Sequence, residues 1–95
     1  MVVSMIQFRI ELPPIESIKD KRRIVVSLKE KLANKFHLSV AEVDLQDSLR
    51  YAHLGAALVS NSRTFGESVM HKALAFVDTN CEGILQDTEV FSETY

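Results

Sequence analysis

Apolar and polar residues alternate along the first segment of the chain and follow a helical spacing along the second. Every second position in residues 2–12 is mostly apolar, which indicates a β-strand. Pro13 and Pro14 cannot continue a strand ladder, and Ser17 is placed to cap a helix that follows. The helix predicted over residues 18–36 carries one apolar stripe, made of Ile24, Val25, Leu28, Leu32 and Phe36. We expect this stripe to pack on a sheet.

The second part of the chain repeats this alternation of strands and a helix. Ala41, Val43 and Leu45 face one way in a second alternation, which predicts a short, half-exposed strand. Residues 54–59 are apolar on both faces, as in an interior strand. Asn80 and Gly83 follow a helix predicted over residues 63–78, and residues 84–94 predict a last strand whose register is left open by residues 86–88. The stripe predicted for this second helix consists of Phe65, Val69, Ala73, Phe76 and Val77.

The order of these elements, β-α-β-β-α-β, predicts an α+β protein with the ferredoxin-like arrangement. We expect a four-stranded antiparallel sheet in the order 4-1-3-2, with both helices on one face and the first and third strands in the centre. A chain of 95 residues has room for one domain, residues 1–95. Domains this small bury little surface, and the single Cys81 cannot form an internal disulfide, so we expect a homodimer to supply extra burial.

The sequence also bears on where the protein is found. No stretch approaches the ~20 uncharged apolar residues of a membrane-spanning helix. The first apolar run is followed by Pro13 and Pro14 and lacks the charged start and cleavage site of a signal peptide. We therefore expect a cytoplasmic protein with no membrane segment.

Charge is distributed unevenly along the chain, although its formal net charge is only −2. Residues 17–36 hold seven basic side chains against two acidic ones. On the predicted helix, the cluster on the solvent side consists of Lys19, Arg22, Arg23 and Lys29. Lys21 instead falls at the N-terminal end of the apolar stripe, where its stem is expected to run along apolar surface and its ammonium to reach solvent.

The cationic cluster lies where the helix dipole favours acidic residues, so it predicts a phosphate or an acidic partner. We interpret it as a surface that contacts structured RNA or a ribosomal component by neutralising the backbone. The residues assigned to this surface are Lys19, Lys21, Arg22, Arg23 and Lys29, joined by Arg50 and Arg63. The alternative is a solvated helix face, with Lys21 covering the rim of the sheet or pairing with a carboxylate.

Other chemistry finds little support in the sequence. One cysteine and three scattered histidines do not predict a metal site. Three unclustered glycines cannot form a phosphate-cradling loop, and no cofactor is expected. Residues 54–59 offer no aromatic side chain on which a base could stack. We expect a protein that is not an enzyme; the enzymatic alternative is a small hydrolase or isomerase that uses Asp47 with Lys21.

The face of the sheet opposite the helices is the second candidate binding surface. Val3 and Met5 project there from the first strand, and Ala57 and Val59 from the third, so this face is partly apolar. A bare apolar patch usually indicates a partner, either a second copy of the chain or another protein. Alternatively, Phe91 and Tyr95, in the C-terminal segment, cover the patch within one chain.

A set of short motifs runs through nearly the whole chain: residues 17–23, 27–28, Phe36, residues 39–43, Asp47, residues 54–55 and 59–61. Together they resemble the YlxP-like family of small bacterial proteins of undetermined function. The resemblance implies a ferredoxin-like fold and a gene neighbourhood of translation and ribosome-maturation factors, and it implies no established activity. The chain departs mildly from the family pattern at Ile18 and Asp20. It departs more clearly at Leu49, near which many members carry tryptophan.

Overall fold

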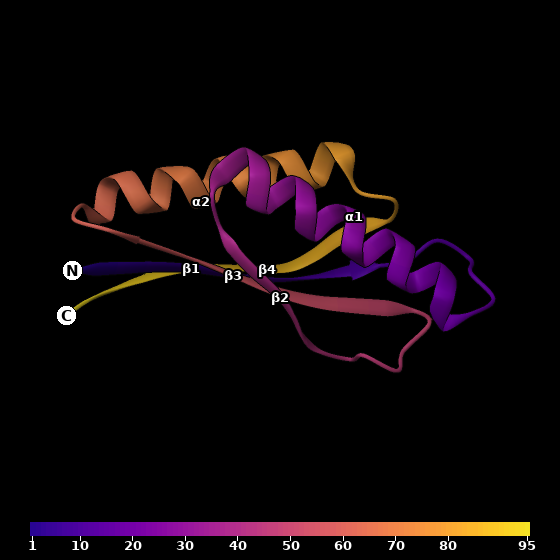
Figure 1. Ribbon diagram of the computed structural model, residues 1–95. Helices are drawn as coiled ribbons and strands as arrows, with labels where there is room; N and C mark the ends of the chain where they lie inside the picture. The colour runs from indigo at the N-terminus through magenta and orange to yellow at the C-terminus, as the bar shows by residue number, and fades with distance from the viewer.

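The structure, a computed structural model that describes residues 1–95, is an antiparallel sheet covered on one face by two helices (Figure 1). Its elements are β1 (Val2–Glu11), α1 (Ile18–Phe36), β2 (Ser39–Asp44), β3 (Tyr51–Ser60), α2 (Arg63–Asn80) and β4 (Ile84–Thr94). The strands lie in the order β2-β3-β1-β4, which is the predicted order read from the other edge. The α+β class, the four strands and the central positions of β1 and β3 are therefore confirmed.

The core lies between the helices and the covered face of the sheet. Every second residue of β1 is buried there, including Ile6, Phe8 and Ile10. From α1 the predicted stripe is confirmed, since Ile24, Val25, Leu28 and Leu32 are buried and Phe36 packs at its edge. The cap is confirmed as well, because Ser17 Oγ accepts a hydrogen bond from the Asp20 amide at 3.2 Å. Neither helix has the length and apolarity needed to cross a membrane.

The buried stripe of α2 differs from the one predicted. It consists of Gly66, Met70, Ala73 and Val77, whereas Phe65 is 58% exposed. The physical reason is the close approach of this helix to β1 and β4. Gly66 lies against a buried hydrogen bond of 2.9 Å between Ser4 Oγ and Ser92 Oγ. Only a residue without a side chain fits this point of contact, so the helix turns Gly66 inward and Phe65 outward.

Irregularities in β4 and β2 set the register of these two edge strands, which the sequence pattern did not predict correctly. Between the pairs Gln7–Glu89 and Arg9–Gln86, β4 holds one residue more than β1, and Asp87 adopts a φ of 52°. A second irregularity lies in β2, between Glu42 and Asp44. Because Leu45 leaves the strand with a φ of 60°, the prediction that Leu45 continues the strand is wrong.

The contact at Gly66 gives a first testable prediction. A Cβ at this position would overlap the side chain of Ser4, so we expect Gly66→Ala to lower the free energy of unfolding by about 1–3 kcal/mol. This direction is opposite to the effect of alanine on an unconstrained helix. The control is Gly55→Ala, whose Cβ would lie 3.2 Å from a methyl group of the exposed Val43 and 3.7 Å from the Ile6 carbonyl oxygen, with no overlap. Urea denaturation measures both variants, and equal losses of stability would contradict the close-contact account.

Candidate functional site

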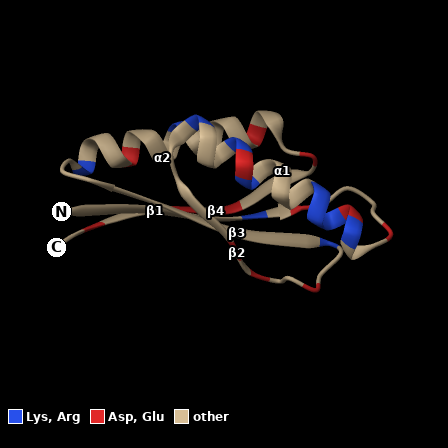
Figure 2. Cartoon of the chain, in the orientation of Figure 1, with Lys and Arg blue, Asp and Glu red and all other residues tan.

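Four basic side chains form a surface near the start of α1, which we call the basic surface: Lys19, Arg22, Arg23 and Lys29. Figure 2 shows this gathering of basic residues at one end of the molecule. Lys19, Arg22 and Arg23 are exposed and Lys29 is half-buried. Only Arg23 has an ion-pair partner, Glu82, at 3.5 Å. The structure thus places these four predicted residues on one side of α1 and leaves three of them without an ion-pair partner.

A groove with a volume of about 320 Å³ lies beside the basic surface, which is at the lower end of the range of about 300–1,000 Å³ typical of ligand sites. Arg22, Val26 and Lys29 line it from α1, and Gln46 and Asp47 line it from the loop between β2 and β3. Lys21 and Glu42 also line the groove, so its lining holds three cations and two carboxylates.

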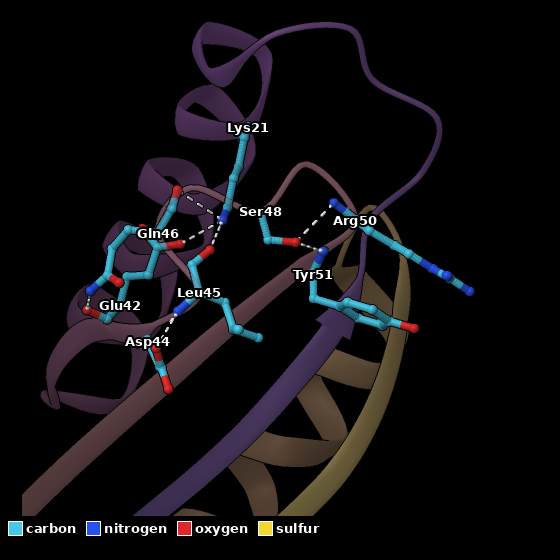
Figure 3. A network of polar contacts seen from close by, with 8 residues as sticks. All are labelled: Lys21, Glu42, Asp44, Leu45, Gln46, Ser48, Arg50 and Tyr51. Carbon is cyan, nitrogen blue, oxygen red and sulfur yellow. Dashed lines mark hydrogen bonds and ion pairs between the residues drawn. The ribbon is translucent and has the colours of Figure 1, made fainter.

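Lys21 points away from this surface and into the protein. Its side chain is 2% exposed, and Nζ donates hydrogen bonds to the carbonyl oxygens of Leu45 at 2.6 Å and Gln46 at 3.2 Å. The Glu42 Oε2 atom lies 3.1 Å from Nζ (Figure 3). The expectation that the Lys21 ammonium reaches solvent is therefore wrong. The β2–β3 loop folds over this ammonium and supplies the oxygen atoms that replace water.

The ion pair between Lys21 and Glu42 compensates a carboxylate oxygen that has no other partner. Glu42 Oε2 is buried and accepts no hydrogen bond of good geometry, so Nζ is the only positive group beside it. A buried carboxylate without a counter-charge is strongly destabilising. Lys21 thus ties α1 to β2 and to the following loop, and it adds no charge to the basic surface.

Asp47 lies near Lys21 without pairing with it. Both residues line the same groove, yet the carboxylate that Lys21 meets belongs to Glu42, and Asp47 is exposed. The loop is closed by Ser48 instead, because Ser48 Oγ accepts hydrogen bonds from the amides of Arg50 at 3.2 Å and Tyr51 at 3.0 Å. An acid–base pair of Asp47 with Lys21 is therefore absent from this arrangement.

Arg50 and Arg63 lie at opposite ends of the sheet. Arg50 is at the same end as the start of α1, since its carbonyl accepts a hydrogen bond of 2.8 Å from the Leu12 amide. Arg63 begins α2 at the other end, where it donates to the Ser92 carbonyl at 2.9 Å and to Thr94 Oγ1 at 3.3 Å. The structure therefore separates Arg63 from the basic surface and uses it to hold the end of β4.

Tyr51 and Arg9 are candidate residues that the sequence reasoning missed. Tyr51 pairs with Glu11 across β3 and β1, which places its ring on the open face of the sheet. The guanidinium carbons of Arg9 and Arg50 each lie 5.2 Å from the centre of this ring. Sequence reasoning started the strand at residue 54, and so overlooked an aromatic side chain. The alternation of Tyr51, His53 and Gly55 was the available signal.

The open face also carries an apolar groove with a volume of about 310 Å³. Its apolar wall includes Met5, Ala41, Val43, Gly55, Ala57 and Phe91. Phe91 pairs with Met5 and is part of this wall, while Tyr95 is 68% exposed and donates to Glu93 at 2.7 Å. Phe91 therefore lies along the groove without closing it, and Tyr95 does not contribute to its lining, so the alternative in which both rings cover the face is met only in part by Phe91.

Cys81 follows the last residue of α2 and packs, partly buried, against the core. Burial raises the pKa of the Cys81 thiol above its ordinary value, and the charge of Asp78 acts in the same direction. The thiol thus stays protonated at neutral pH, which is the opposite of an activated nucleophile.

Residues 3–90 match the sequence model of a family described as "Protein of unknown function (DUF503)", and the chain belongs to this family. One relative is the protein called "Uncharacterized protein YlxP" from Bacillus subtilis (strain 168). The two sequences are 35% identical over 63 residues, which is 66% of this chain and 68% of the relative. The resemblance to the YlxP-like family is therefore confirmed.

The buried ion pair predicts a large difference between neighbouring lysines. Lys21→Met keeps much of the side-chain length but leaves Glu42 without its counter-charge, so we expect the free energy of unfolding to fall by about 3–5 kcal/mol. The control Lys19→Met, at an exposed position of the same turn, is expected to change it by less than about 0.5 kcal/mol. Urea denaturation measures both, and adding Glu42→Gln to Lys21→Met should restore part of the loss. Equal stabilities of the two single variants would rule out the anchoring role.

Proposed function

We propose that this protein is a binding protein without catalytic activity, which contacts structured RNA, including RNA of a ribosomal component, through the basic surface. The observation that supports this most is a set of three cations without ion-pair partners: the exposed Lys19 and Arg22 and the half-buried Lys29. They lie on one side of α1 in a chain whose formal net charge is −2. Such a local excess of positive charge favours a polyanion.

The proposed mechanism is neutralisation of RNA phosphates. Arg22 and Lys29 reach over one groove, and Lys19 extends the positive charge toward the start of the helix, where backbone amides also favour an anion. Arg50 adds a further charge at the same end of the sheet. We also propose that the fold is ferredoxin-like, supported by its βαββαβ order, and that the protein works in the cytoplasm, where such RNA is found.

The proposal predicts a strong salt dependence of RNA binding, most of which comes from the basic surface. The test variant carries alanine in place of the three unpaired cations, Lys19, Arg22 and Lys29. Because each lost phosphate contact reduces the slope of log K against log salt by about 0.7–0.9, we expect the slope to fall by about 2–3. Fluorescence anisotropy with a short RNA stem-loop, at salt concentrations between about 50 and 200 mM, measures the slope.

The matched control removes the same charge from other parts of the helical layer. This control variant carries alanine at Lys31, Lys35 and Lys72, which are all exposed. We expect it to keep nearly the whole slope, because its substitutions lie outside the basic surface. If both variants lose the same affinity, the binding reflects overall charge and the assignment of the basic surface is wrong.

The apolar groove of the open face favours a second candidate function, in which the protein forms a structural homodimer or binds a protein through this face. We propose the second copy of the chain as the occupant. In a symmetric dimer, the apolar side chains of this face would be buried on both copies. A small domain buries little of its own surface, and a single cysteine cannot add an internal disulfide, so a second copy would supply the missing stabilisation. The two candidates are compatible, since the basic surface and the open face lie on different sides of the sheet.

Sedimentation velocity tests the dimer with a pair of equally exposed valines. Val43 lies on the open face and Val26 on α1, and each is 48% exposed. We expect the wild-type protein to sediment as a dimer, Val43→Lys to shift it toward the monomer by placing charges in the interface, and Val26→Lys to leave it unchanged. A wild-type protein that is monomeric at all concentrations would exclude this candidate.

A further inference from the structure

The ring of Tyr51 and its two arginine neighbours form a cluster that the basic surface does not include. Tyr51 comes from the start of β3, Arg9 from β1, and Arg50 from the residue before the strand. Tyr51 and Arg9 share the open face, at the end of the sheet where α1 begins. Aromatic rings on a sheet face, accompanied by positive charge, are the general means by which proteins bind unpaired nucleotides.

The two arginines differ in their contacts. Arg9 has an ion-pair partner, whereas the Arg50 guanidinium contacts only the Tyr51 ring. Arg9 donates from Nε at 2.9 Å and from Nη2 at 2.6 Å to the same oxygen of Asp87, so its guanidinium is fixed. The Arg50 guanidinium has no hydrogen bond or ion pair, and the Tyr51 ring is the partner it contacts. A base that stacks on the ring therefore displaces only Arg50, whose charge is then free to contact the phosphate of the same nucleotide.

The backbone beneath this cluster is fixed before any ligand arrives. Ser48 Oγ accepts hydrogen bonds from the amides of both Arg50 and Tyr51 (Figure 3). Earlier in the same loop, Lys21 Nζ donates to the carbonyl oxygens of Leu45 and Gln46. In the same view the side chains of Arg50 and Tyr51 extend to one side, away from Lys21. A ring on a fixed strand loses little conformational freedom when a base stacks on it.

We propose that Tyr51, with Arg9 and Arg50, binds one unpaired base of an RNA whose neighbouring phosphates contact the basic surface. This inference rests on the proposed function and narrows it to a class of RNA, a helical stem interrupted by an unpaired nucleotide. Arg50 lies between the two contacts, because its loop runs from the groove beside α1 to the start of β3. The basic surface thus holds the stem, and the ring selects the unpaired base.

Tyrosine fluorescence gives a direct test, because the chain has no tryptophan and two tyrosines. In Tyr95→Phe, the remaining emission comes from Tyr51. We expect an RNA stem with one unpaired adenosine to quench this emission, and the same stem fully paired to leave it nearly unchanged. In the wild-type background, Tyr51→Ala should weaken binding of the interrupted stem by about tenfold and Tyr51→Phe should preserve it, since a base stacks on either ring.

The outcomes separate this inference from the proposed function. If Tyr51→Ala binds the interrupted stem as tightly as the wild type, and no quenching occurs, the stacking site is wrong while binding by the basic surface stands. If the wild-type protein binds neither stem, both proposals fail. Tyr51→Leu, which keeps apolar bulk without an aromatic ring, should weaken binding as alanine does. A tight-binding leucine variant would assign Tyr51 a packing role and overturn the inference.

Discussion

The buried ammonium of Lys21 is the interaction on which the arrangement of this end of the molecule depends. It joins the first turns of α1 to Glu42 on β2 and to two carbonyls of the following loop. These partners lie 21 to 25 residues away along the chain, so no local preference of the sequence brings them together. Because all three partners bind the same ammonium group, the β2–β3 loop is held against α1. The position of this loop in turn fixes the groove and the start of β3.

This constraint separates the cations of α1 into two kinds. Lys21 is surrounded by oxygen atoms of its own protein, so its charge is satisfied within the fold. Lys19 and Arg22 flank Lys21 in the first turns of α1, Lys29 lies further along the helix, and none of these three has an ion-pair partner. A positive charge in the first turn of a helix is unfavourable by a few tenths of a kcal/mol, and Lys19 stands there without an ion-pair partner. In the function that we propose, a polyanionic partner would offset this cost.

The element order and the sheet order could be predicted from the sequence, because periods of two and 3.6 residues report directly on exposed and buried faces. The stripe of α1 followed this rule. Phe65 did not, since the close contact at Gly66 depends on Ser4 and Ser92, which are distant in sequence. The bulge at Asp87 likewise arises between strands and leaves only a weak polar signal in the chain.

The candidate site could be predicted only where it depends on local spacing. The solvent side of α1 was visible as a helical pattern, so Lys19, Arg22, Arg23 and Lys29 were placed together. The burial of Lys21 could not be predicted without knowing which loop folds over it. Likewise, the placement of Arg63 away from the basic surface depends on the sheet order and on the length of β3. Tyr51 was missed because the turn closed by Ser48 starts the strand earlier than the apolar run indicates.

The central claim is that RNA contacts the end of the molecule organised by Lys21. Amide chemical shifts of the isotope-labelled protein, recorded by NMR during titration with an RNA stem that carries one unpaired adenosine, test this claim most directly. The account predicts shift changes confined to the first turns of α1, the β2–β3 loop, and the strand positions of Arg9 and Tyr51. Shift changes that centre on α2 or on the end of the sheet near Arg63, or no changes at all, would contradict it.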